Sequence, residues 1–339
     1  MANPHETPSA SNSSGGETQT LTPPPAPLLG IIAAFAIVYV VWGSTYLAIR
    51  FAVETIPPFL MAGLRFIVSG SLMYLYLWMR GQAKTTKKEL VAAAMSGGLM
   101  LIGGNGLVSW AEQFVPSGIT ALIIGTSPLW IVLLGWLAFG DDRPGPGVWL
   151  GLILGLIGVY LLTDQSGIAG ESIDPFGAVA LLFACFFWAW GSFLSKSKSM
   201  PKSTLLSVAL QMLTAGVALL IISTCLGEPF TVDIAAISTK SLLSLAYLIV
   251  FGAIIAYTCY GWLFRNCSPA LVSTYAYVNP MVAVILGYFL AAEEIGPSTL
   301  LAAGFILGGV FLVSIKKKKK VAPESIEERE PELAAASRE

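Results

Sequence analysis

Long apolar stretches alternate with short polar ones over most of the chain. Each apolar stretch holds about 20 residues, the length that a helix needs to cross ~30 Å of hydrocarbon. The segments that fit this length are 29–51, 59–79, 90–113, 117–139, 146–163, 175–195, 205–226, 241–264, 269–291 and 298–315. The pattern predicts an all-α membrane protein with ten transmembrane helices.

Composition strengthens this prediction. Of the 339 residues, 12% are charged and 55% are hydrophobic, whereas about 25% of the residues of a typical soluble domain are charged. The few polar residues cannot cover the apolar surface of so many hydrophobic ones in water. The net charge of −1 provides no basic face for phosphates, so nucleic acid is not an expected partner. The expected surroundings are a lipid bilayer.

Residues that usually catalyse reactions or bind metals are sparse. The four cysteines form no CxxC pair, and the single histidine, His5, lies in the polar N-terminal stretch. The sequence also has no GxxxxGK[ST] phosphate-binding loop. We therefore expect no catalytic site, no metal, no cofactor and no direct use of ATP.

The two ends of the chain lack the apolar pattern. Residues 1–28 are rich in Ser, Thr, Pro and Gly and hold no Lys or Arg, so they lack the positive start of a secretory signal. Residues 316–339 begin with the basic run Lys316 to Lys320 and continue as a polar, acidic stretch. We expect two disordered cytoplasmic tails. The lysine run is either a simple stop-transfer anchor or a contact for anionic lipids.

Basic residues in the loops predict the orientation. If the N-terminus is cytoplasmic, 16 of the 19 basic residues fall on the cytoplasmic side, Arg50 and Lys240 fall outside, and Arg65 lies within a helix. Cytoplasmic loops of membrane proteins carry an excess of Lys and Arg. The sequence thus predicts a multi-pass protein of the inner (plasma) membrane with both termini in the cytoplasm.

An internal repeat relates the two halves of the sequence. At an offset of 152 residues, matches include Trp110 with Trp262, Pro128 with Pro280, Gly135 with Gly287, and Asp141-Asp142 with Glu293-Glu294. At an offset of 148, Trp42-Gly43-Ser44 falls on Trp190-Gly191-Ser192. The predicted units are 29–163 and 175–315, with five helices each. Because five is odd, the units have opposite orientations, which is typical of carriers that work by alternating access.

At these positions the chain resembles the EamA family of the drug/metabolite transporter superfamily, of the bacterial inner-membrane type. The segments that carry the resemblance are WGSTYLAIR (42–50), PPFLMAGLRF (57–66), GNGLVSWAEQFVPSGITALI (104–123), SPLW (127–130) and SPALVSTYAYVNP (268–280). Asp141 stands where the family usually has Glu, so the acidic character is retained. The resemblance implies a transporter, and exporter rather than importer follows from it alone.

Two charged residues lie in predicted membrane segments, where each has a high insertion cost. Arg65 and Glu112 lie at similar depth in neighbouring helices, and both charges are missing from the second repeat. We predict that they form an ion pair. It would act either as a fixed clamp or as a gate that contacts a zwitterionic substrate. If transport is coupled to protons, Glu112 is the first carboxylate to test.

Three further groups of residues are candidates for the substrate pathway. Asn105, Ser109 and Glu112 share one helical face, and Pro128 and Pro280, each preceded by a polar residue, are candidate hinges. The polar and aromatic candidates for the pathway are Trp42, Asn105, Ser109, Glu112, Ser127, Trp190, Tyr257, Tyr260, Tyr275 and Asn279. Their alternative roles are interhelical hydrogen bonding, kinks needed for packing and the interfacial aromatic belt.

These observations favour a secondary transporter that exports small metabolites, such as amino acids or related amphipathic and aromatic compounds. The alternative is a membrane receptor or an intramembrane enzyme without transport activity. GxxxG patterns at Gly151, Gly155, Gly304 and Gly308 indicate close helix packing, either within one chain or between the two chains of a homodimer.

Overall fold

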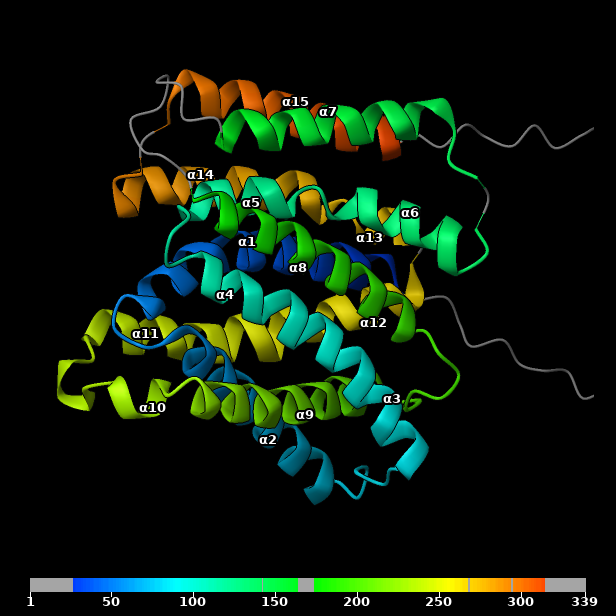
Figure 1. Cartoon of the computed structure of the whole chain (residues 1–339). Coiled ribbons are helices and arrows are strands. Elements are labelled where there is room, and N and C mark those ends of the chain that lie inside the picture. Colours follow the sequence, from blue (N-terminus) through cyan, green and yellow to red (C-terminus); the bar gives the residue numbers. More distant parts are fainter. Residues whose placement is uncertain (1–26, 142, 164–173, 268, 294, 315–339) are drawn as a thin grey trace, which may run out of the picture.

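The computed structural model describes residues 27–141, 143–163, 174–267, 269–293 and 295–314, and every regular element in these ranges is helical (Figure 1). The first half holds α1 (Leu28–Val53), α2 (Pro58–Met79), α3 (Lys87–Gly97), η1 (Gly98–Gly106), α4 (Leu107–Ala111), α5 (Ser117–Ile124), α6 (Ser127–Ala138) and α7 (Pro146–Thr163). The second half holds α8 (Pro175–Leu194), α9 (Thr204–Cys225), α10 (Glu228–Thr231), η2 (Ile234–Ala236), α11 (Thr239–Tyr247), η3 (Leu248–Tyr257), α12 (Thr258–Asn266), α13 (Pro269–Val272), α14 (Tyr275–Ala291) and α15 (Pro297–Ser314). The all-α class is confirmed for this part of the chain. The predicted tails lie outside it, apart from residues 27 and 28.

Seven helical stretches are long and apolar enough to cross a membrane. They are Leu28–Val53, Pro58–Met79, Lys87–Ala111, Ser117–Ala138, Pro175–Leu194, Thr204–Cys225 and Thr239–Asn266. Shorter apolar helices lie at Pro146–Gly158, Val278–Ala291 and Thr299–Gly309. The membrane character is thus supported by seven spans, and the count of ten crossings stays a prediction.

Local sequence explains where several helices begin. The Thr86 side chain accepts a hydrogen bond from the backbone N–H of Glu89, whose carboxylate accepts one from the Thr86 N–H, so α3 starts with a capping box. Ser203 caps α9 by accepting from the Leu206 N–H at 3.3 Å. Proline occupies the first turn of α2 and α8, where its missing N–H costs no hydrogen bond.

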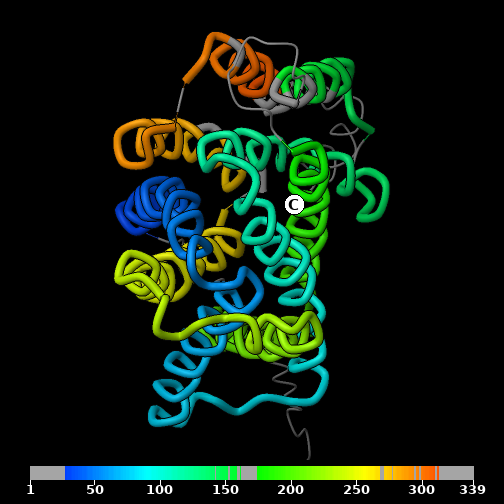
Figure 2. Tube along the Cα trace, turned by 60° about the vertical axis from the view of Figure 1, so that its left-hand side comes forward, coloured from blue at the N-terminus to red at the C-terminus, as the bar shows by residue number. Residues whose placement is uncertain are grey.

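The helices stack in layers around α1. In Figures 1 and 2, α7 and α15 pair at one edge, α2 and α9 lie toward the opposite edge, and α1 lies between them. α1 packs against α14, α11, η3 and α5, so it touches elements from both halves of the chain. Two large buried clusters surround it, one centred on α2, α9 and α12 and the other on α4, α5 and α8.

Two long helical stretches contain π-helical segments in their middle. η1 separates α3 from α4, and η3 separates α11 from α12. The repeat offset of 152 residues places 98–106 on 250–258, so the two segments occupy equivalent positions. π-Helical turns occur often at functional sites. Their pairing across the repeat indicates a shared structural role.

The first helices of the two repeats run in opposite directions. The end of α1 and the start of α8 both lie near Val115, because Arg50 donates to its carbonyl and the Gly177 backbone packs on its side chain. The start of α1 lies near Trp262 of α12, and Arg265 of α12 binds the carbonyls of residues that follow α8. α1 and α8 therefore lie antiparallel, as expected for inverted units.

Close packing of α2 and α9 provides a test of this arrangement. A Cβ at Gly216 would lie 2.6 Å from the backbone nitrogen of Ile67, so Gly216→Ala forces the two helices apart. We expect this change to lower the free energy of unfolding by about 1–3 kcal/mol, measured as a lower melting temperature in detergent. Gly304→Ala is the control, because a Cβ there meets no atom of the described residues within 4 Å. Equal melting temperatures for the two variants would contradict the packing described.

Candidate functional site

A small cavity of about 60 Å³ lies between the helices of the bundle. Its wall combines α1, α2, η1, α4, the α5–α6 junction, α8 and α14. Small-molecule sites usually hold roughly 300–1,000 Å³, so the cavity must widen from this conformation to admit a metabolite. Its polar side chains include those of Thr45, Tyr46, Arg65, Asn105 and Ser127.

Aromatic rings form one wall of this cavity. The Trp42 ring lies 5.4 Å from that of Trp188, 4.9 Å from that of Tyr260 and 5.5 Å from that of Tyr275, centroid to centroid. The Trp42 indole donates to the carbonyl of Gly252 in η3 at 3.2 Å, which fixes its orientation. Such a wall suits flat or apolar parts of a ligand.

Arg65 supplies the positive charge of the cavity. The side chain is buried, and its Nη1 donates to Asn105 Oδ1 at 3.2 Å, while its Nε has no hydrogen-bond partner among the described residues. The guanidinium rests against Gly252, where a Cβ would lie 2.9 Å from Nη2. Because part of its hydrogen-bonding capacity is unused, Arg65 can donate to an anionic group in the cavity.

The predicted ion pair between Arg65 and Glu112 is absent. No nitrogen–oxygen contact within 4.0 Å joins them in the described chain. Arg65 instead contacts Asn105, the second-to-last residue of η1. Both Glu112 carboxylate oxygens are buried without a hydrogen-bond partner in the same part of the chain. The clamp interpretation therefore lacks its contact in this conformation.

Other predicted pathway residues divide into two groups. Trp42, Asn105, Ser127 and Tyr275 line the cavity. Ser109 does not, because its hydroxyl donates to the Asn105 carbonyl within its own helix.

Trp190 lies in a different aromatic cluster, with ring centroids 5.5 Å from Phe186 and 6.5 Å from Phe139. Trp188, which sequence reasoning missed, occupies the cavity wall instead. The offset of 148 residues matches Trp42 with Trp190. An offset of 146, which places Leu64 and Gly70 on Leu210 and Gly216, matches Trp42 with Trp188.

Tyr257 and Tyr260 border a second, smaller hollow, on the side of the aromatic wall that faces Arg265. Tyr257 donates to Gln211 Oε1 at 2.7 Å, and Tyr260 shares a hydrogen bond of 2.9 Å with Ser192. Tyr260 also contacts the Trp42 ring, so it lies between the two hollows. The aromatic wall separates the central cavity from this second space.

The second candidate hinge lies beside the break that precedes the first. The helix is interrupted between α5 and α6, where the hydroxyls of Thr126 and Ser127 donate to the carbonyls of Ile123 and Ile124 at 2.7 and 2.6 Å. Pro128 is the second residue of α6, directly after this break. A Cβ at Gly125 would lie 3.4 Å from the ring of Pro280, which is inside α14. Pro280 therefore packs against the α5–α6 junction.

Asn279 ties the second hinge to α1. Oriented as its neighbours require, its amide nitrogen donates to the carbonyls of Tyr39 and Tyr275 at 3.1 and 3.2 Å. Gly43 allows this approach, because a Cβ there would lie 2.6 Å from that of Val282. Asn279 thus holds α1 and α14 together rather than lining the cavity.

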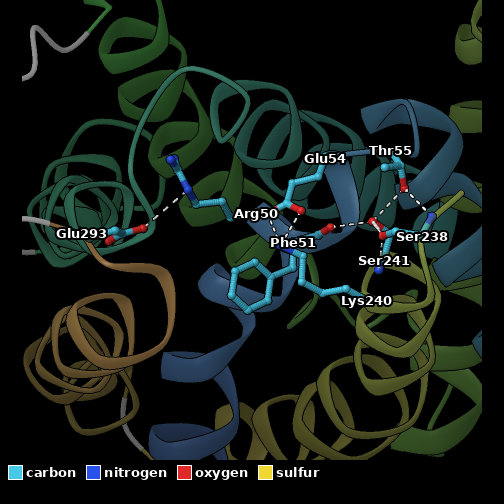
Figure 3. Close-up of polar contacts among 8 residues, drawn as sticks. All are labelled: Arg50, Phe51, Glu54, Thr55, Ser238, Lys240, Ser241 and Glu293. Atoms are coloured by element: carbon cyan, nitrogen blue, oxygen red, sulfur yellow. Dashed lines mark hydrogen bonds and ion pairs between the residues drawn. The ribbon is translucent and has the colours of Figure 1, made fainter. Parts of the chain in front are cut away.

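Glu293, which follows α14, connects the two halves of the chain at one end of the bundle. Its carboxylate accepts from the backbone N–H of Ser117 at 2.8 Å, the Ser117 hydroxyl at 2.7 Å and the N–H of Gly118 at 3.0 Å. These groups form the N-terminus of α5, where a negative charge is favoured. The Nε of Arg50 lies 3.6 Å from the same carboxylate (Figure 3). We call this contact the Glu293 latch.

A second set of contacts joins α1 to α11 at the same end. Lys240 pairs with Glu54, and Thr55 donates to the Ser241 hydroxyl at 2.8 Å (Figure 3). The Ser241 hydroxyl in turn donates to the carbonyl of Phe51 at 2.7 Å. The end of α1 is therefore held on both sides by elements of the second repeat.

The acidic residues that follow α6 and α14 are each held by the same kind of backbone turn. The Asp141 N–H donates to the Gly135 carbonyl at 2.9 Å, and the Glu293 N–H donates to the Gly287 carbonyl at 3.1 Å. Both pairs are related by the offset of 152 residues. The repeat signal pointed to these acids, but it did not show that one of them caps a helix of the other repeat.

Removal of the Glu293 latch should make the interior near α5 more accessible to a water-soluble reagent. Glu293→Ala deletes three hydrogen bonds to α5, and we expect a buried cysteine introduced by Thr120→Cys to react faster with a membrane-impermeant thiol reagent. Loss of a helix cap also lowers the free energy of unfolding by about 0.5–2 kcal/mol. The background has its four native cysteines replaced.

Glu54→Ala is the matched control, since it removes an exposed ion pair at the same end but no helix cap. A reaction rate at Thr120→Cys that Glu293→Ala leaves unchanged would contradict the assigned role of the latch.

Comparison with known proteins identifies the family. The sequence model of the EamA-like transporter family matches residues 28–164 and 175–315. The chain is 40% identical over 302 residues to the uncharacterized inner membrane transporter YedA of Escherichia coli K12, covering 87% of this chain and 96% of YedA. It is 24% identical to a probable amino-acid metabolite efflux pump of Salmonella typhimurium, covering 84% and 96% of the two chains.

A solved structure titled only as a crystal structure of a protein shares the fold, with a TM-score of 0.60 and 19% identity over 84% of this chain and 97% of that one. YedA is named as a transporter and the Salmonella relative as an efflux pump, which points away from an enzyme. With matches across both repeats and 40% identity to YedA, the chain belongs to the EamA-like transporter family.

Proposed function

We propose that the protein is a secondary transporter that exports small amphipathic metabolites across the inner membrane. The observation that carries this proposal is the central cavity, in which the incompletely bonded guanidinium of Arg65 faces an aromatic wall around Trp42. Neither a receptor nor an intramembrane enzyme has a general need for a cavity of this kind between two inverted halves.

The lining indicates the class of substrate. Arg65 suits a carboxylate or another anionic group, because arginine pairs with planar anions through parallel N–H donors. Trp42, Trp188 and Tyr275 suit a flat or apolar side group. Amino acids and related aromatic or amphipathic acids combine both features. The name of the Salmonella relative, an amino-acid metabolite efflux pump, supports the same class.

Alternating access between inverted halves is the proposed mechanism. In our proposal ten helices cross the membrane, both termini are cytoplasmic, and the end that carries Arg50 and Lys240 faces outward. The Glu293 latch then closes the outer side of the cavity, and the Tyr260 wall separates the cavity from the inner hollow beside Arg265. Exchanging the conformations of the two repeats would open the outer side.

The first experiment is a thermal-shift screen of the purified protein against amino acids, aromatic metabolites, nucleosides and sugars. Compounds that stabilise the protein are then tested for counterflow in proteoliposomes. Saturable counterflow of an amphipathic acid supports the proposal, and stabilisation only by neutral sugars or nucleosides contradicts the substrate class. A screen with neither stabilisation nor flux contradicts the transporter proposal itself.

Gly252 offers a way to displace Arg65 without changing its charge. Gly252→Ala places a Cβ 2.9 Å from Nη2 of Arg65 and 3.0 Å from the side chain of Thr45. We expect the substrate concentration that gives half-maximal counterflow to rise about tenfold, equivalent to ~1.4 kcal/mol of lost binding, with folding retained.

The matched control is Gly98→Ala in η1, where the nearest atom to the added Cβ is 4.0 Å away. If both variants bind the compound as the parent protein does, Arg65 does not contact the substrate.

A further inference from the structure

Glu112 combines features that the proposed transport mechanism leaves unexplained. Its side chain is 1% exposed, and neither carboxylate oxygen has a hydrogen-bond partner within the described residues. Its backbone N–H donates to the carbonyl of Val108, one turn earlier, and Val108 lines the central cavity. Three residues later, the Val115 carbonyl accepts from Arg50 of the latch region. Glu112 thus lies between the cavity and the Glu293 latch.

The charged groups around Glu112 are occupied elsewhere. The groups close enough to interact with it electrostatically are Arg65 on α2, Arg50 and Tyr46 on α1, and Glu293 after α14. Arg65 donates to Asn105, while Arg50 contacts Glu293 and Val115. α8, which also packs on α4, has no charged residue between its ends. No cation therefore forms a direct ion pair with Glu112 in the described chain.

An ionised carboxylate in such a place is costly, because burial removes its hydration and nothing replaces it. A bound proton neutralises the group and removes most of this cost. Opening the latch would change both conditions at once, since water would reach Glu112 and Arg50 would lose Glu293 as its partner. The same carboxylate would then be solvated beside a free cation. Its proton occupancy is thereby linked to the state of the latch.

We propose that Glu112 binds a proton while the Glu293 latch is closed and releases it when the latch opens. Opening places the carboxylate in water beside the cation of Arg50, which favours the ionised form, and closure returns it to a buried site without a partner, which favours the neutral acid. The proton is therefore exchanged with the water that enters when the latch opens. That the latch closes the outer side of the cavity rests on the proposed function, whereas the protonated state of Glu112 in the closed form does not.

Infrared spectroscopy of the full-length protein in lipid nanodiscs tests the proton site without any substrate. We expect a carbonyl band of a protonated, dehydrated carboxylic acid at neutral pH. The band should disappear in Glu112→Gln and persist in Glu54→Gln, which changes an exposed carboxylate paired with Lys240. Glu112→Asp should retain the band at a shifted position, which separates loss of the group from misfolding. A parent protein without the band, or Glu112→Gln with an unchanged band, would overturn the proposal.

The pH dependence of latch opening tests the linkage. In the Thr120→Cys background, the rate of reaction with the membrane-impermeant thiol reagent, corrected for the thiolate fraction of a free model thiol, should rise with pH, because loss of the Glu112 proton favours the open latch. Glu112→Gln should lose this pH dependence, since the amide has no proton to release, whereas Glu54→Gln should keep it. A corrected rate that rises with pH equally in Glu112→Gln and in the parent protein would overturn the linkage while leaving the transporter proposal intact. Absence of all counterflow in the screen would contradict the proposed function, while the infrared band would still decide the proton site.

Discussion

The absence of water inside a bilayer is the constraint on which the architecture depends. Any backbone group released by a broken helix must find a partner within the protein. At the α5–α6 break, the hydroxyls of Thr126 and Ser127 satisfy the carbonyls of Ile123 and Ile124. Ser127 also lines the cavity. This break therefore lies beside the region where a ligand would bind, and short polar side chains offset its cost.

The contacts at the Arg50 end bring distant parts of the sequence together. Glu293 reaches the start of α5 across 176 residues, and Ser241 reaches Thr55 across 186. In both contacts a residue of one repeat binds a helix end of the other. Two of the three hydrogen bonds that Glu293 accepts come from backbone N–H groups, and the third comes from the Ser117 hydroxyl. The contact therefore depends mainly on where the two repeats place α5 and Glu293.

Sequence patterns predicted the helical class, the positions of the apolar segments and the repeat, because these depend on hydrophobic periodicity alone. The cavity wall was predicted in part, since Trp42, Asn105, Ser127 and Tyr275 do line it. Trp188 was missed because two residues along a helix separate faces by about 200°, and the rotation of α8 is set by its partners. The Arg65–Glu112 pair was predicted from depth alone. Depth does not reveal that Arg65 rests on Gly252 and reaches Asn105 first.

The paired π-helical segments have a mechanical consequence. A π-helical turn holds more residues than an α-helical turn. Converting η1 to α-helix would therefore rotate α4 relative to α3 by roughly 100° for each extra residue that the wide turn holds. Asn105 is within η1, and Val108 and Glu112 follow it. A short migration of the wide turn along the helix would therefore redirect these side chains with all but a few backbone hydrogen bonds kept. η3 provides the same freedom to Gly252, which packs against Arg65 and Thr45.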